Sequence, residues 1–272
     1  MFEAKPIVRY ALYNNIQDIL REAGNNAFSV HMSYLPHLRM YTDSSRPVKM
    51  PSYKIGIGTQ YVHRLKGRDD LLVGSYTTGH YSNGQSGCAF LDGHSDTSPE
   101  CDVQYASLTS DTSLSTLLNR TNGNFSTNFT EVEFEYRIVT LHDYQPREYQ
   151  SFIFGLEVYH DKLLYVGDIG GFTERDIEIY GRTRLRLGYK YERPISSTFQ
   201  AMVNVLFERI LDADLRIEAN RYEIDLSVYR QMIGLVVGLS SGHDNYNLRF
   251  VDAGTQFSIG ITWKAFPFFD WG

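Results

Sequence analysis

The sequence predicts an all-β protein, a transmembrane antiparallel up-and-down β-barrel of about 10–12 strands. Three observations lead to this fold class. Segments of about ten residues alternate between apolar and polar side chains, which is the period of a strand with two different faces. Aromatic residues make up 14% of the chain, including 20 Tyr and 16 Phe, a composition that favours strands. The expected connections alternate between short and long, as they do in transmembrane barrels.

The bulk composition narrows the alternatives. At 272 residues with 42% hydrophobic side chains, the chain is long enough for one domain with a large buried surface. A net charge of −6 and the absence of a basic run argue against a nucleic-acid partner, whose phosphates require positive charge. The longest apolar run, Met232 to Leu239, is far short of a membrane helix, which needs about 20 residues. Any membrane crossing is therefore expected to use strands.

The chain is expected to divide into a leader, residues 1–26, and the barrel, residues 27–272. The first residues lack the apolar run of a signal peptide, so a mature or recombinant chain is expected. Within the leader, Asn15 to Arg21 has apolar residues at helical spacing, and a short helix there is one interpretation. Pro6 to Tyr13 could instead add a strand to the sheet.

The alternation is clearest in two segments. From Asn128 to Val139, Val132, Phe134 and other apolar residues alternate with Glu131, Glu133, Glu135 and Arg137. From Tyr180 to Tyr191, apolar residues alternate with Arg182, Arg184, Arg186 and Lys190. Acidic and basic rows of this kind would neutralise each other inside a polar lumen, and apolar rows outside with polar rows inside are the pattern of a transmembrane barrel.

Ten strands are expected, separated by connections of two lengths. The strands are near 27–35, 53–65, 70–83, 127–141, 149–160, 177–191, 197–208, 221–229, 231–240 and 255–266. Short connections fall at 66–69, 142–148, 192–196 and around Arg230, and long ones at 36–52, 84–126, 161–176, 209–220 and 241–254. Alternation alone does not decide which face is inside, and a soluble barrel would invert the arrangement. The alternation of short and long connections favours the transmembrane form.

The longest connection carries both cysteines. Cys88 and Cys101 lie close together in a polar segment, and we expect them to form a disulfide in an oxidising compartment. Three N-x-S/T sequons at Asn119, Asn124 and Asn128 leave open a secreted, glycosylated soluble protein.

A candidate catalytic group lies just before that connection. His80 and Ser82 are two residues apart on one strand, so their side chains project to the same side. If the strands near 70–83 and 127–141 pair, Asn128 and Thr130 lie across from Ser82 and His80, and Asn128 can accept a hydrogen bond from His80. A serine becomes a nucleophile when a neighbouring base, itself held by a third group, takes its proton.

The segment His80-Tyr81-Ser82-Asn83-Gly84 resembles the motif His-x-Ser-Asn-Gly of the outer-membrane phospholipase A family. The resemblance implies a triad on the outside of the barrel at the level of the outer leaflet. Ser82 would be the nucleophile, His80 the general base and Asn128 the orienting amide. Asn119, followed by Arg120 as in the family's Asn-Arg pair, is the rival for the third role. The lipid A deacylases of outer membranes resemble this chain as well, through a His-x-Ser-Asn element.

The same resemblance implies Ca²⁺ as a cofactor, and Asp92, Asp96, Glu100 and Asp102 are oxygen-rich candidates for binding it. Gln85 stands where the family has Arg, and the interval from Ser82 to the candidate Asn is longer here. The other histidines show no spacing typical of a zinc site.

We therefore expect a serine acyl hydrolase of a Gram-negative outer membrane that cleaves fatty-acid esters of phospholipids at the outer leaflet. Lipid A deacylation is one alternative, and a non-enzymatic pore, adhesin or scaffold of an envelope complex is another. The expected partners are membrane lipids, with a homodimer or an envelope-protein complex left open.

Overall fold

The computed structural model describes residues 2–16, 24–40, 48–66, 69–142, 145–163, 170–171, 173–244 and 252–263. Its strands are β1 (Phe2–Ala4), β2 (Val8–Asn14), β3 (Asn26–Met40), β4 (Val48–Arg64), β5 (Leu71–Ser82), β6 (Ser126–His142), β7 (Gln145–His160), β8 (Thr183–Pro194), β9 (Phe199–Ile210), β10 (Asn220–Arg230), β11 (Ile233–His243) and β12 (Ala253–Trp263). The helices are α2 (Pro99–Ala106), α3 (Leu114–Leu117) and α4 (Glu174–Tyr180). No helix in these ranges is long and apolar enough to cross a membrane.

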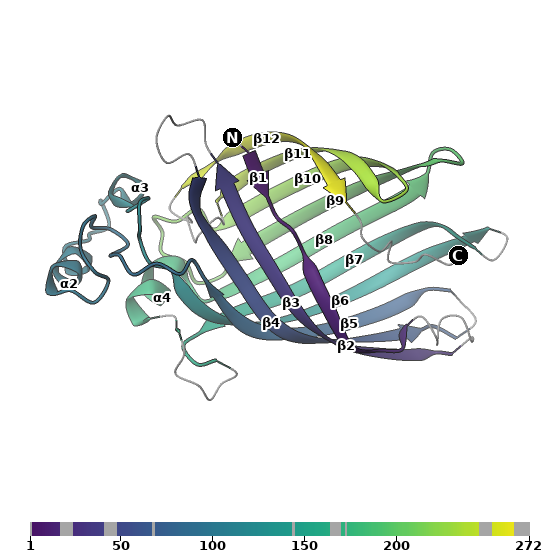
Figure 1. The fold of residues 1–272 in the computed structure, drawn as a ribbon, viewed down its shortest axis with the longest axis horizontal. Coiled ribbons are helices and arrows are strands. Elements are labelled where there is room, and N and C mark those ends of the chain that lie inside the picture. Colours follow the sequence, from purple (N-terminus) through teal and green to yellow (C-terminus); the bar gives the residue numbers. More distant parts are fainter. Residues whose placement is uncertain are drawn as a thin grey trace.

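The strands form one antiparallel sheet in which each strand from β3 to β12 pairs with its neighbours in sequence order. This is the expected up-and-down barrel, and Figure 1 shows the long tilted strands arranged side by side around the interior. The helices α2 and α3, from the β5–β6 connection, and α4, which precedes β8, gather at one end of the barrel, which we call the loop end. The opposite end is the turn end.

The outward face is apolar and the inward face is polar, as the alternation predicts. On β6 the outward Phe134 is 58% exposed, whereas the inward Glu135 is 9% exposed. The same contrast holds on β8, where Leu187 is 45% exposed and Arg184 only 1%. Side chains that face a bilayer must be apolar because charged groups there cost several kcal/mol near the midplane.

A network of ion pairs fills the lumen. The Arg186 guanidinium contacts the carboxylates of Glu131, Glu157 and Glu208. Lys54 on β4 lies 2.5 Å from Glu157, and the network therefore links strands from β4 to β9. Buried charges need such partners because removing them from water is costly. Of the opposite charges predicted for the two strands, Arg186 and Glu131 are paired directly.

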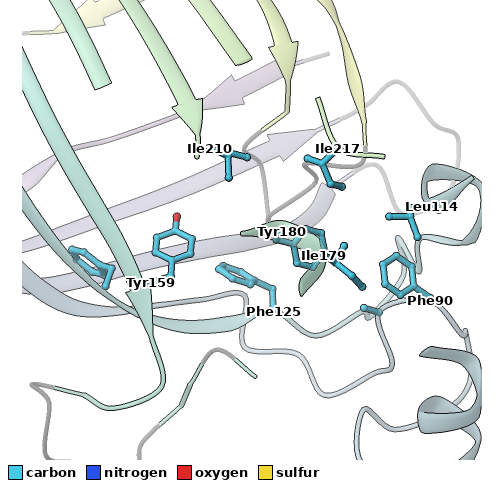
Figure 2. Packing of buried hydrophobic residues seen from close by; sticks show 10 residues of the cluster. Phe90, Leu114, Phe125, Tyr159, Ile179, Tyr180, Ile210 and Ile217 are labelled. Carbon is cyan, nitrogen blue, oxygen red and sulfur yellow. The ribbon is translucent and has the colours of Figure 1, made fainter. Parts of the chain in front are cut away.

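A cap of loop segments covers the loop end of the lumen. We use this name for the β5–β6 connection, α4 and the β9–β10 connection. Its apolar cluster, much of it drawn in Figure 2, joins loop residues to inward residues of the strand ends. The buried members are Ala89, Phe90, Leu114, Phe125, Phe129, Tyr159, Ile179, Tyr180, Ile210 and Ile217.

A smaller apolar cluster lies at the turn end, where Ala27, Val62, Leu71 and Val73 pack together. Ile16, which follows β2, packs against it. Apolar packing thus covers both ends of the charged lumen.

The N-terminal residues belong to the sheet. Both β1 and β2 pair with β3, so residues 2–14 form a strand interrupted near Pro6, and residue 26 is not a structural boundary. A short segment with a proline breaks the alternation from which strands are predicted. Most of the helix predicted for 15–21 lies outside the described residues.

Two predicted connections are partly wrong. The connection expected at 36–52 is mostly strand, since β3 continues to Met40 and β4 begins at Val48. Pro36, which suggests a break, pairs within the ladder opposite Tyr53. The strand expected from 177 begins instead at Thr183, because α4 occupies 174–180. Thr173 caps that helix by accepting a hydrogen bond from the Asp176 amide.

The two ends of the sheet meet through side chains. Arg39 on β3 donates to Asp244, just after β11, at 2.5 Å and to Glu3 on β1 at 2.7 Å. Among the described residues, no ladder of backbone hydrogen bonds joins β12 to β1 or β2. Ion pairs therefore join β1 and β3 to the residue that follows β11 at the loop end.

Candidate active site

The candidate residues lie on the outward face of β5 and β6, next to the loop end. On β5, Leu72 and Tyr76 point outward with 44% and 39% exposure. His80 and Ser82 share their parity and therefore face the same side. On β6, Asn128 shares the parity of the outward Phe134. The three side chains thus lie on the wall of the barrel and not in its lumen.

His80 and Asn128 are in direct contact. They are opposite each other in the β5–β6 ladder, and His80 Nδ1 lies 3.0 Å from Asn128 Oδ1. The Asn128 amide nitrogen donates to the carbonyl oxygens of Asp161, at 3.1 Å, and Gly170, at 3.4 Å. Asn128 itself is fully buried.

These contacts select one tautomer of the imidazole ring. Carbonyl oxygens only accept hydrogen bonds, so they hold the amide nitrogen of Asn128 and turn its oxygen toward His80. An amide oxygen also only accepts, and His80 Nδ1 must therefore carry the hydrogen. In the neutral ring the lone pair is then on Nε2, the form that a general base requires.

Ser82 follows His80 by two residues on the same face, but the residue opposite Ser82 in the β5–β6 ladder differs from the expected one. Ser126, and not Asn128, is opposite Ser82, and Thr130 is opposite Thr78. The pairing is therefore shifted by two residues. No hydrogen bond joins Ser82 to His80 in the described part of the chain. Residues two apart on a strand have Cα atoms about 7 Å apart, so the hydroxyl reaches the imidazole only if the side chains turn toward each other.

Asn83 and Gly84 have structural roles. The Asn83 side chain accepts hydrogen bonds from the amides of Gln85 and Phe125 and donates to Gly123 O at 2.8 Å. It therefore joins the two ends of the β5–β6 connection directly after Ser82. Gly84 has a φ of 66°, a left-handed conformation that glycine adopts without strain.

The Asn119 side chain binds groups of the β5–β6 connection and not His80. Its amide nitrogen donates to Cys88 O and to the Asn122 side chain, and its oxygen accepts from the backbone of Thr121 and Asn122. The geometry therefore joins Asn128, and not Asn119, to His80. Arg120, which follows it, pairs with Asp252.

The predicted disulfide is present. Cys88 and Cys101 are bonded, with their Cα atoms 5.7 Å apart, and both are buried in the cap. Cys101 belongs to α2, so the bond fastens that helix to the beginning of the β5–β6 connection.

The acidic residues suggested for Ca²⁺ do not converge. Asp96 and Asp102 bind the Arg175 guanidinium, and Asp92 accepts from the Gly93 amide. Glu100 lies 3.8 Å from His94. Within the described ranges, no three His, Cys, Asp or Glu side chains are grouped as a metal site. These four residues do not fit a Ca²⁺ ion in this arrangement.

A second chain of polar side chains, which the sequence did not predict, lies beside the His80–Asn128 pair. On the same outward face, Thr78 Oγ1 lies 3.1 Å from Thr130 Oγ1, which lies 3.0 Å from His160 Nε2. His160 is opposite Asn128 in the β6–β7 ladder. In the sequence, the even numbers of Asn128, Thr130 and His160 already indicate that the three side chains share a face. Only the register between β6 and β7 shows that they are neighbours.

Comparison with known proteins adds little to this picture. No protein-family model matches the chain, and no curated protein matches it. Among solved structures, a Pseudomonas aeruginosa FadL homologue is similar over 96% of this chain, with 10% identity and a TM-score of 0.36. The chain spans 64% of that protein's length. At this distance, the likeness says nothing about the site.

Proposed function

We propose that this barrel is an outer-membrane serine acyl hydrolase that cleaves fatty-acid esters of phospholipids at the outer leaflet. The observation that carries the proposal is the His80–Asn128 hydrogen bond on the outward wall, with Ser82 two residues further along the same face. A base oriented by a third group, close to a hydroxyl, is the arrangement that makes serine nucleophilic. Its position on the wall brings it to the ester bonds of membrane lipids.

The reaction then takes two steps. Ser82 Oγ attacks the ester carbonyl while its proton passes to His80 Nε2, and the protonated imidazole returns that proton to the leaving lysolipid alcohol. The acyl group remains on Ser82 until water, deprotonated by His80, releases it as a fatty acid. Asn128 keeps the Nδ1 hydrogen in place and stabilises the imidazolium that forms in each step.

One backbone group is suited to the oxyanion. The amides of Asn83 and Gln85 donate to Phe125 O and to the Asn83 side chain, respectively. The amide of Gly84 has no acceptor among the described residues. A hydrogen-bond donor close to the nucleophile stabilises the negative charge of the tetrahedral intermediate.

The packed lumen favours chemistry on the wall over conduction. Arg186, Glu157 and Glu208 occupy the interior as bonded pairs, and the apolar cap cluster lies above them. A pore would need a continuous aqueous path through these groups.

The test is Ser82→Ala, with Ser126→Ala as the matched control because Ser126 is opposite on β6. We expect Ser82→Ala to abolish fatty-acid release from mixed phospholipid micelles and to abolish labelling of the barrel by a fluorophosphonate. Ser126→Ala should retain both. Heat-modifiable mobility on gels reports whether each barrel is folded. Unchanged release by folded Ser82→Ala would overturn the proposal.

Parallel assays with phospholipid and with lipid A separate the two possible substrates. Release from lipid A alone would move the proposal to lipid A deacylation.

A further inference from the structure

The geometry points to Gly170, in the β7–β8 connection, as a positioning residue for His80. This inference rests on the proposed function only for the role of His80 as a base. Independently of that role, Gly170 sets the orientation and the tautomer of the His80 imidazole.

The first observation is the hydrogen bond from Asn128. The Asn128 amide nitrogen donates to Gly170 O at 3.4 Å as well as to Asp161 O at 3.1 Å. Both carbonyls come from the segment that follows β7, so this segment and not β6 decides which way the amide points. A rotated amide would set its oxygen against two carbonyl oxygens, which is unfavourable.

The second observation is the missing side chain. A Cβ atom at position 170 would lie 2.2 Å from His80 Cε1, 2.8 Å from His80 Nδ1 and 3.0 Å from Ser126 Oγ. The first two distances are well inside van der Waals contact. The Gly170 backbone therefore lies directly against the Nδ1–Cε1 edge of the ring, where a Cβ atom would require the ring to shift.

The third observation is the backbone conformation. Gly170 has a φ of 60°, which costs about 1 kcal/mol or more for most other residues. Conformation and space thus require glycine independently. Asn128 and Gly170 both contact the Nδ1 side of the ring, which leaves the Nε2–Cδ2 edge on the other side.

A side chain at this position is expected to turn the imidazole and break the Nδ1–Asn128 bond. The hydrogen is then no longer confined to Nδ1, and the fraction of His80 with a free Nε2 falls. A displacement of about 1 Å in a catalytic group can lower a rate by about 10²-fold.

The test compares Gly170→Ala with Gly93→Ala. Gly93 also has a positive φ, 79°, but nothing lies within 4 Å of its Cβ position, so its variant carries the backbone cost alone. The readout is the ring ¹⁵N chemical shifts of histidine-labelled protein in detergent micelles, with His80 assigned from the spectrum of His80→Gln.

We expect the Nδ1–H tautomer for His80 in the wild type and in Gly93→Ala, and a mixed or Nε2–H signal in Gly170→Ala. Fatty-acid release should fall about 10²-fold in Gly170→Ala, mainly through kcat. If that variant does not fold, Gly170→Asn relieves the backbone strain because Asn tolerates positive φ, and it still adds a side chain.

The outcomes separate the two proposals. An Nε2–H tautomer in the wild type, or an unchanged His80 signal in a folded Gly170 variant, would overturn the role of Gly170. A tautomer that changes as expected in a barrel without hydrolase activity would leave that role intact and refute the proposed function instead.

Discussion

Replacing Asn128 by Ala removes a side chain that makes three hydrogen bonds to residues that the structure describes: to His80 Nδ1, Asp161 O and Gly170 O. Asn128 is fully buried, so water does not easily replace them. At about 0.5–1.5 kcal/mol for each bond, the barrel should lose about 1.5–4.5 kcal/mol of stability. Asn128 orients the general base, whose contribution of about 10²–10⁴-fold, or about 3–5 kcal/mol in the activation free energy, is the upper limit of the catalytic loss.

The assay is initial fatty-acid release from mixed micelles, with thermal unfolding of the same preparations measured by heat-modifiable gel mobility. Asn119→Ala is the matched control, since Asn119 is also buried but binds only groups of the β5–β6 connection. It should cost stability while the rate stays within a few-fold of wild type. Asn128→Asp keeps an acceptor for His80 Nδ1 and should fall between wild type and Asn128→Ala. Full activity in folded Asn128→Ala would refute the assignment of Asn128.

Three further predictions concern the cap. Asn83→Ala removes three hydrogen bonds at about 1 kcal/mol each, so limited proteolysis should cut the β5–β6 connection faster; equal cleavage would contradict the role of Asn83. Cys88→Ser removes a cross-link worth about 3 kcal/mol for a loop of this size. The cap should therefore melt at a lower temperature, and reductant should have the same effect on the wild type. An unchanged melting temperature would contradict a stabilising role of the disulfide. Burial raises the pKa of the Asp176 carboxyl above its ordinary 3.8. Because a raised pKa makes ionisation costly in the folded state, stability falls as pH rises above about 4. Asp176→Asn should therefore be more stable than wild type at pH 7, a difference that disappears at pH 3 in thermal melts, whereas a constant difference would contradict the sign.

The sequence predicts the barrel wall well because alternation is a local property. The acidic row from Glu131 and the basic row that includes Arg186 predicted the two faces of each strand, and the alternation of short and long connections favoured the charged rows inside. Strand ends were harder. Residues 36–40 continue β3 because His37 and Arg39 bind Glu3 on β1, a partner that is distant in sequence.

The register of the site could not be predicted in the same way. A shift of two residues leaves every side chain on its own face, so alternation does not distinguish Asn128 opposite His80 from Asn128 opposite Ser82. The 43 residues between β5 and β6 give no tight turn that would fix the pairing.

Gly170 was beyond prediction for another reason. It lies 42 residues after Asn128 in a connection without periodicity. Its importance is a matter of space around His80, which only the assembled wall defines.

The outward placement of the His80–Asn128 pair has a kinetic consequence. Under the proposed function, the lipid ester would reach the pair by lateral diffusion in the membrane, so its effective concentration would be its mole fraction among the lipids and not its molarity in the bulk solution. Diluting the target ester with an inert amphiphile at constant bulk concentration should therefore slow turnover. Diluting the whole suspension with buffer should not.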